Sequence, residues 1–281
     1  MGSFIDALFN PDLPFIRNAL AAGFLSAILF GVLGSVITVK RISGLAGSIS
    51  HAVLGGIGMA LFFSSTNIIP GFPPMAGAML FALLSAVIIG FVSLKAKQRE
   101  DTVINAIWAI GMSIGVLFMA KSPGYTDPSS YLFGNILLIS SKDLILMAVL
   151  DGLVLFLAWR FYPQIEATAF DEEFSRVRKV PAPAFFMVLL AVTAVAIVLL
   201  QTFVGIVMVI AMLTLPAGCA GYSAKSLWGM MIGASCFSAL FSTAGLVSGW
   251  YLDMPVGSVV VIIAGLVFLA YALAAMVRKR R

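Results

Sequence analysis

Long apolar stretches that hold almost no charge occupy most of this chain. Hydrophobic residues make up 61% of the 281 positions and charged residues only 10%, whereas a soluble domain carries about 25% charged residues. A helix of about 20 apolar residues crosses the roughly 30 Å hydrocarbon core of a bilayer. Because so apolar a chain cannot cover its surface with charge in water, we predict an all-α, polytopic integral membrane protein with one transmembrane domain over residues 1–281.

The apolar stretches divide into nine candidate spans. Two of them, the second and the seventh, are short and rich in Gly or Pro, and a re-entrant or broken segment there would leave eight full spans. A short interfacial helix within residues 3–16 precedes the first span and ends near Pro11 or Pro14. The nine spans are 17–39, 46–63, 73–94, 103–120, 142–160, 182–201, 204–221, 227–250 and 256–277.

Basic residues fall unevenly between the two sides of this arrangement. Lys and Arg concentrate in the cytoplasmic loops of membrane proteins, so we place the C-terminus in the cytoplasm and the N-terminus outside. Only Arg17, Lys121 and Lys142 of the 17 basic residues then lie outside. The others are cytoplasmic: Lys40, Arg41, Lys95, Lys97, Arg99, Arg160, Arg176, Arg178, Lys179, Lys225, Arg278, Lys279, Arg280 and Arg281.

The largest cytoplasmic loop covers residues 161–181 and contains a short amphipathic pattern. Apolar residues recur at helical spacing from Ala167 to Val177. The acidic residues Asp171, Glu172 and Glu173 come before the basic residues of the same segment, an order that suits the helix dipole. The pattern indicates a surface helix, either a plain one or one that a partner protein recognises.

Sequence motifs of several enzyme classes are absent. There is no GxxxxGK[ST] nucleotide-binding loop, no HExxH zinc motif and no GxSxG nucleophile motif, and the chain has one histidine. The net charge of +5 arises from short loops between apolar runs and does not indicate nucleic-acid binding. We therefore expect a non-catalytic protein that functions in transport, signalling or scaffolding.

The single histidine, His51, lies inside the second span on a stripe of small residues. Gly47, His51, Gly55 and Gly58 recur at i, i+4, i+8 and i+11 and so share one helix face. Small residues let another helix backbone approach closely, and they also leave room for an ion beside the imidazole, a good ligand for divalent transition metals. Both a packing role and a metal path remain open from the spacing.

Two further positions inside the spans are candidates for function. Asp151 lies near the middle of the fifth span, where it either pairs with a neighbouring polar group or lines a transport path. Pro216 interrupts the seventh span and removes the hydrogen bond to the carbonyl of Met212. It indicates either a packing kink or a gate.

Five stretches in register resemble one known family. They are SHAVLGGIG (50–58), DTVINAIWAIGMSIGVLF (101–118), SYLFGNIL (130–137), ATAFDEEFSRVR (167–178) and VGIVMVIAMLTLPAGCA (204–220). The sequence is similar over essentially its whole length to the membrane subunit of bacterial metal-importing ABC transporters, the zinc/manganese/iron permease family.

The resemblance implies a fold like that of the cobalamin importers and a multi-pass location in the bacterial inner membrane. It implies a homodimer, two separate ATP-binding subunits at the cytoplasmic face, and an extracellular or periplasmic protein that delivers the metal. The chain itself would bind no cofactor, and its cargo would be a divalent metal ion. The helix at 167–178 would couple to the ATPase through Phe170, Asp171, Glu172, Glu173 and Phe174, while His51 and Asp151 are the metal-ligand candidates.

Two positions depart from the family pattern, and one of them is Asn105, where a glycine is expected. Many members carry an acidic residue four positions before the histidine, and here that position is Gly47. The cargo among manganese, zinc and iron therefore stays open. Two other functions remain as alternatives: a permease for a metal chelate or cobalamin, which usually has about ten spans, and an ion-coupled secondary transporter, which should contain several intramembrane carboxylates.

Overall fold

The computed structural model describes residues 4–95, 100–123, 131, 132, 134, 139–170 and 181–279. These residues form helices and loops and contain no strand. The helices are α1 (Phe4–Phe9), α2 (Pro14–Val39), α3 (Ser43–Ser65), α4 (Pro74–Lys95), α5 (Glu100–Lys121), α7 (Ser141–Arg160), α8 (Tyr162–Phe170), α10 (Ala182–Val204), α11 (Ile206–Gly221), α12 (Leu227–Leu252) and α13 (Val256–Lys279).

Each of the nine predicted spans corresponds to one helix, and the all-α membrane fold is confirmed. Seven helices of the described part are long and apolar enough to cross a membrane, and α7 with α8, bent by 75° at their junction, makes an eighth candidate. The helix α11, which corresponds to the seventh predicted span, is not among these candidates because it has only 16 residues. At 1.5 Å per residue such a helix is shorter than the hydrocarbon core.

Local sequence signals set several helix ends. The interfacial helix predicted within residues 3–16 is α1, which ends before Pro11, and α2 begins with Pro14 at its first position, where a missing N–H costs nothing. Ser140 and Asp143 form a capping box at the start of α7. Gly205 separates α10 from α11 with φ of 83°, a left-handed conformation that glycine adopts without strain.

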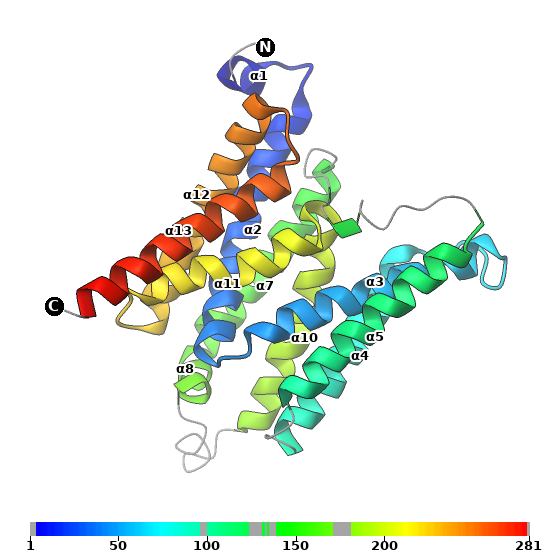
Figure 1. Ribbon diagram of the computed structural model, residues 1–281, viewed down its shortest axis with the longest axis horizontal. Helices are drawn as coiled ribbons and strands as arrows, with labels where there is room; N and C mark the ends of the chain where they lie inside the picture. The colour runs from blue at the N-terminus through cyan, green and yellow to red at the C-terminus, as the bar shows by residue number, and fades with distance from the viewer. Residues whose placement is uncertain are drawn as a thin grey trace.

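The helices pack in two groups that meet at α10 and α11 (Figure 1). In one group α3 packs between α4 and α5. In the other, α2 contacts α7, α11 and α12, and α13 covers α11 and α12. The helix α10 contacts α4, α3 and α11, and α11 also contacts α3, so α10 and α11 join the groups.

Burial separates inner helices from outer ones. Most of α2 and α3 is buried, whereas α5 and α13 are largely exposed. Their exposed side chains are large and apolar, as with Leu117 on α5 and Leu266 on α13. Since these surfaces cannot face water without great cost, they face lipid or a partner subunit.

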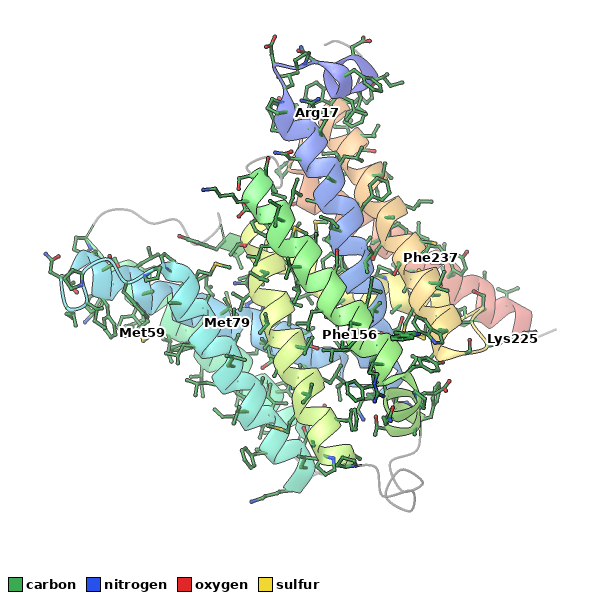
Figure 2. All side chains as sticks on the ribbon, turned by 180° about the vertical axis from the view of Figure 1, so that it is seen from behind. Arg17, Met59, Met79, Phe156, Lys225 and Phe237 are labelled. Atoms are coloured by element: carbon green, nitrogen blue, oxygen red, sulfur yellow. The ribbon has the colours of Figure 1, made fainter. Side chains whose placement is uncertain are left out.

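The ends of the helices gather at two opposite sides of the molecule. Arg17 near the start of α2 and Lys225 before α12 lie at opposite ends (Figure 2). Lys40 and Arg41 line one cleft together with Lys225, so these three basic residues lie at the same end. The positions of these three residues agree with the predicted grouping of basic residues at one side.

Candidate functional site

His51 lies on α3 with its ring stacked on that of Trp108 from α5. The ring centroids are 4.8 Å apart and the planes are inclined by 11°. The side chain is only 8% exposed, and its Nδ1 atom is buried without a hydrogen-bond partner among the described residues. A ring nitrogen that carries a lone pair can accept a hydrogen bond or bind a metal ion. Nδ1 of His51 is therefore available for binding.

Gly47 faces the same indole ring, one helical turn before His51. A Cβ atom at Gly47 would lie 3.5 Å from the nearest carbon of Trp108, which is ordinary van der Waals contact. Trp108 therefore covers the position where many relatives of the predicted family carry an acid, and it also covers His51. A carboxylate at residue 47 would have to share this space with the indole.

Gly55 and Gly58 continue the stripe toward the opposite end of α3, where α5 approaches very closely. A Cβ atom added at Gly55 would lie 2.7 Å from the carbonyl oxygen of Gly111, and one added at Gly58 would lie 2.5 Å from the carbonyl oxygen of Gly115. No real side chain fits at such distances. In this conformation the geometry supports a packing role for these two glycines, with no room for an ion between them and α5.

A buried hydrogen bond fixes the end of the same helix pair that contains Gly47. The Ser48 hydroxyl donates to the carbonyl oxygen of Ile104 at 2.8 Å. This contact lies one residue from Gly47 and holds α5 in register with α3. The position of Trp108 over His51 is thus determined by contacts on both sides of it.

The other metal-ligand candidate, Asp151, lies elsewhere. It is buried on α7, and both carboxylate oxygens lack a hydrogen-bond partner among the described residues. Since α7 packs on α2 whereas α3 packs on α4 and α5, the structure does not bring Asp151 and His51 together. Within the described ranges no three His, Cys, Asp or Glu residues are grouped to hold a metal ion.

Sequence reasoning did not identify Trp108 as part of this site. The residue belongs to a stretch on which the family resemblance was based, but periodicity within one helix does not reveal which residue of another helix lies opposite. Trp108 also lines a shallow groove on the outer face of α5 together with Asn105 and Met112. One edge of the indole is therefore accessible while its face covers His51.

The helix α8 lies at the same end of the molecule as Lys40 and Lys225, because its last residues line one cleft with them. The predicted coupling helix at 167–178 overlaps it only partly, because α8 covers Tyr162–Phe170. Phe170 is exposed, as a partner contact requires. Asp171, Glu172, Glu173 and Phe174 lie outside the described residues.

Two sets of contacts hold α8 against the transmembrane helices. At its start the Tyr162 ring stacks on Trp228 of α12 at 5.1 Å, and the Tyr162 hydroxyl accepts a hydrogen bond from the Trp228 backbone N–H. The same hydroxyl donates to Glu166 at 2.8 Å. Near its end, the Lys40 ammonium of α2 donates to the carbonyl oxygen of Thr168 at 2.8 Å. Displacement of α8 therefore acts directly on α2 and α12.

Pro216 is buried inside α11, and the helix continues past it. The backbone of α2 lies close to the preceding turn: a Cβ atom at Gly34 would lie 2.5 Å from the carbonyl oxygen of Leu213. The proline thus sits where α2 and α11 approach each other without intervening side chains. This geometry is compatible with both roles predicted for Pro216, a packing kink and a gate.

Comparisons with known proteins agree over the whole chain. The family described as "ABC 3 transport family" matches residues 12–275. A protein of Chlamydia muridarum named "Probable metal transport system membrane protein" is 34% identical over 276 residues, 98% of this chain and 93% of that protein. The manganese import system permease protein ScaB of Streptococcus parasanguinis is 29% identical over 280 residues, 99% of this chain and 96% of its own length.

A solved structure shows the same arrangement of helices. PsaBC from Streptococcus pneumoniae, determined in complex with a Fab, contains a chain that superposes with a TM-score of 0.82 at 30% sequence identity. The match covers 95% of this chain and 94% of that one.

Proposed function

The chain belongs to the ABC 3 transport family, and from this we propose that it is the membrane permease subunit of an ATP-driven importer of divalent transition metal ions. Manganese is the first candidate because two full-length or nearly full-length relatives are named as manganese transport proteins. Zinc and iron remain possible cargoes. Family membership argues against an ion-coupled secondary transporter. We also propose that residues 1–281 form one permease domain.

The observation that carries the proposal is the single buried imidazole of His51 within a membrane helix. Its Nδ1 atom has no partner among the described residues. A neutral imidazole suits iron and zinc, and manganese binds mainly through oxygen ligands. A transport path must bind its ion weakly enough to release it. One nitrogen ligand, completed by water or backbone oxygens, is suited to such transient binding.

ATP hydrolysis is assigned to separate partner subunits, so this chain binds no cofactor and has no catalytic residue. We propose a homodimer, with two ATP-binding subunits that contact α8 and the acidic residues 171–173 at the cytoplasmic face. An extracellular or periplasmic metal-binding protein would dock at the end that contains Arg17. This orientation places the N-terminus outside a bacterial cell membrane and the C-terminus inside.

Uptake of radioactive manganese by proteoliposomes tests the function. The chain is reconstituted with its ATPase subunit and its metal-binding protein, and uptake is measured with ATP and with a non-hydrolysable analogue. We expect ATP-dependent accumulation of manganese that excess zinc or iron reduces in proportion to its affinity. Accumulation of a metal chelate but of no free ion would instead favour the chelate permease.

The contact with the ATPase is tested separately. Reversing the charge of Asp171, Glu172 and Glu173 together should abolish co-purification of the ATPase, because an acidic surface on a short loop matters only to a partner that binds it. The variant should still insert into the membrane. Normal uptake by this triple variant would remove the reason to place the ATPase here.

A further inference from the structure

Two cavities adjoin at the end of the molecule that contains α8, and they differ in chemistry. The first, of about 270 Å³, is lined almost entirely by apolar side chains, most of them from α2, α7, α8 and α10. The second, of about 750 Å³, is a polar cleft between the C-terminal end of α2, α8 and the loop before α12. Lys40 and Thr168 line both, so the two spaces meet at these residues.

The polar cleft is basic. Lys40, Arg41 and Lys225 all line it, and no described residue that lines it is acidic. The hydrogen bond from Lys40 to the Thr168 carbonyl holds the ammonium group at the boundary between the cavities. Arg41 has a left-handed backbone conformation with φ of 59°, which is uncommon for a residue other than glycine.

The apolar cavity lies between helices whose outer faces are exposed and apolar. Val154 of α7 and Val188 of α10 line it, and these two helices lie beside each other with Phe156 on the exposed side of α7 (Figure 2). A surface of this kind faces the acyl chains of the bilayer. The cavity can therefore receive an apolar chain laterally from the membrane.

An apolar space that adjoins a polar cleft lined by three cations matches one class of molecule. We propose that these cavities form a binding site for an anionic phospholipid, with one acyl chain between α7 and α10 and the phosphate at Lys40, Arg41 and Lys225. Basic pockets between transmembrane helices on the cytoplasmic side bind anionic headgroups in this way. An acidic segment of a protein partner would match the cleft but would leave the apolar cavity unexplained.

The bound lipid would contact α8 through Thr168 and α2 through Lys40, the two residues that already join these helices. The site therefore lies at the connection through which the proposed ATPase contact acts on the membrane helices. Anionic lipid is expected to stabilise this connection. Binding itself can be measured without transport, so its failure and the failure of the proposed function are distinguishable.

Lipid retention tests the site. The full chain is reconstituted into nanodiscs with equal amounts of phosphatidylglycerol and phosphatidylcholine, extracted in mild detergent, and examined by native mass spectrometry for retained lipid. We expect the wild-type chain to retain phosphatidylglycerol preferentially. Excess inorganic phosphate should not displace it, because phosphate alone leaves the apolar cavity empty. Displacement by phosphate would show a plain anion site and overturn the proposal.

Variants separate the two halves of the site. Arg41→Gln with Lys225→Gln should reduce the preference for phosphatidylglycerol roughly tenfold or more, since each cation near an anionic headgroup contributes substantially. Ala184→Phe, which fills the apolar cavity from α10, should reduce retention of lipid whatever its headgroup. Two matched controls should leave retention unchanged: Lys142→Gln at the opposite end and Ala274→Phe on the exposed face of α13.

Two results would overturn the lipid assignment. The first is retention of phosphatidylglycerol by the double variant and by Ala184→Phe at the wild-type level. The second is loss of ATPase co-purification by the double variant while lipid retention is unchanged, which would assign the basic cleft to a protein partner.

Discussion

At the scale of single residues, the stack of Trp108 on His51 dominates the candidate site. One ring nitrogen of His51 remains buried without a partner among the described residues. The histidine therefore has two distinct roles to test: stacking through its ring and binding through its nitrogen. The sequence predicted where His51 lies and that small residues accompany it. It could not predict the tryptophan opposite, because that contact depends on how two helices pack.

Replacing His51 by phenylalanine tests these roles. His51→Phe keeps an aromatic ring against Trp108 and removes both nitrogens, so we expect a melting temperature close to that of the wild type and loss of most manganese uptake. His51→Ala should lose uptake as well and should also destabilise the fold by about 1–3 kcal/mol through lost packing. If His51→Phe transports at the wild-type rate, the histidine is a packing residue.

Gly47 and Trp108 provide a second test at this scale. Gly47→Asp alone places a carboxylate against the indole ring, and we expect a less stable protein with no gain in metal binding. Gly47→Asp combined with Trp108→Ala frees the space beside His51, and this pair should bind manganese or zinc measurably tighter by isothermal titration. Equal affinity in the single and double variants would show that Trp108 does not restrict the site.

At the scale of helices, the apolar stretches predicted every long helix to within a few residues. They did not fix the start of α8, which begins at Tyr162 although the amphipathic pattern was recognised only from Ala167. The reason is physical: the first turn of α8 is held by Trp228 of α12, a contact between residues far apart in the sequence. Capping motifs and hydrophobic periodicity reveal only interactions between residues that are close in the sequence.

The contact of α8 with α12 gives the prediction at this scale. Tyr162→Phe keeps the stack on Trp228 but removes the hydrogen bonds to Glu166 and from the Trp228 N–H, each worth about 0.5–1.5 kcal/mol. We expect ATP hydrolysis by the assembled transporter to continue while metal transport per ATP falls. Tyr222→Phe, an exposed tyrosine, is the control. Unchanged coupling in Tyr162→Phe would show that α12 does not respond to α8.

The close approach of α3 and α5 is testable with two glycines. Gly58→Ala introduces a Cβ atom 2.5 Å from the Gly115 carbonyl oxygen, and overpacking of this kind destabilises a protein by about 1–3 kcal/mol. Gly152→Ala adds a methyl group with no atom within 4 Å and should be neutral or slightly stabilising. Thermal unfolding in detergent compares them, and equal melting temperatures would contradict the packing described above.

At the scale of the whole molecule, the uneven distribution of basic residues predicted which helix ends lie together. Composition and the positive-inside rule are enough for this, because each long apolar helix reverses the direction of the chain. They do not predict that the helices form two groups joined by α10 and α11. That division depends on which buried faces fit one another.

The orientation in the membrane is tested by cysteine labelling. Asn67→Cys lies in the exposed loop between α3 and α4, and Lys225→Cys lies at the opposite end. A membrane-impermeant maleimide should label Asn67→Cys in intact cells and Lys225→Cys only after permeabilisation. The reverse result would invert the proposed topology. Labelling of both variants in intact cells would contradict the predicted number of membrane crossings between the two positions.

The backbone contacts between α3 and α5 also restrict how such a transporter can change shape. At Gly55 and Gly58 there is no room for a Cβ atom between α3 and the carbonyl oxygens of α5. Neither helix can therefore slide or roll past the other without a steric clash. The two helices must then travel as one rigid body, carrying His51 and Trp108 together. The helix α4 meets α3 as closely at Gly56 and Gly77, so it moves with them. The remaining degrees of freedom lie in the short turn at residues 40–42 and in the contacts with α10 and α11, so alternating access would tilt α3, α4 and α5 as a unit relative to α2.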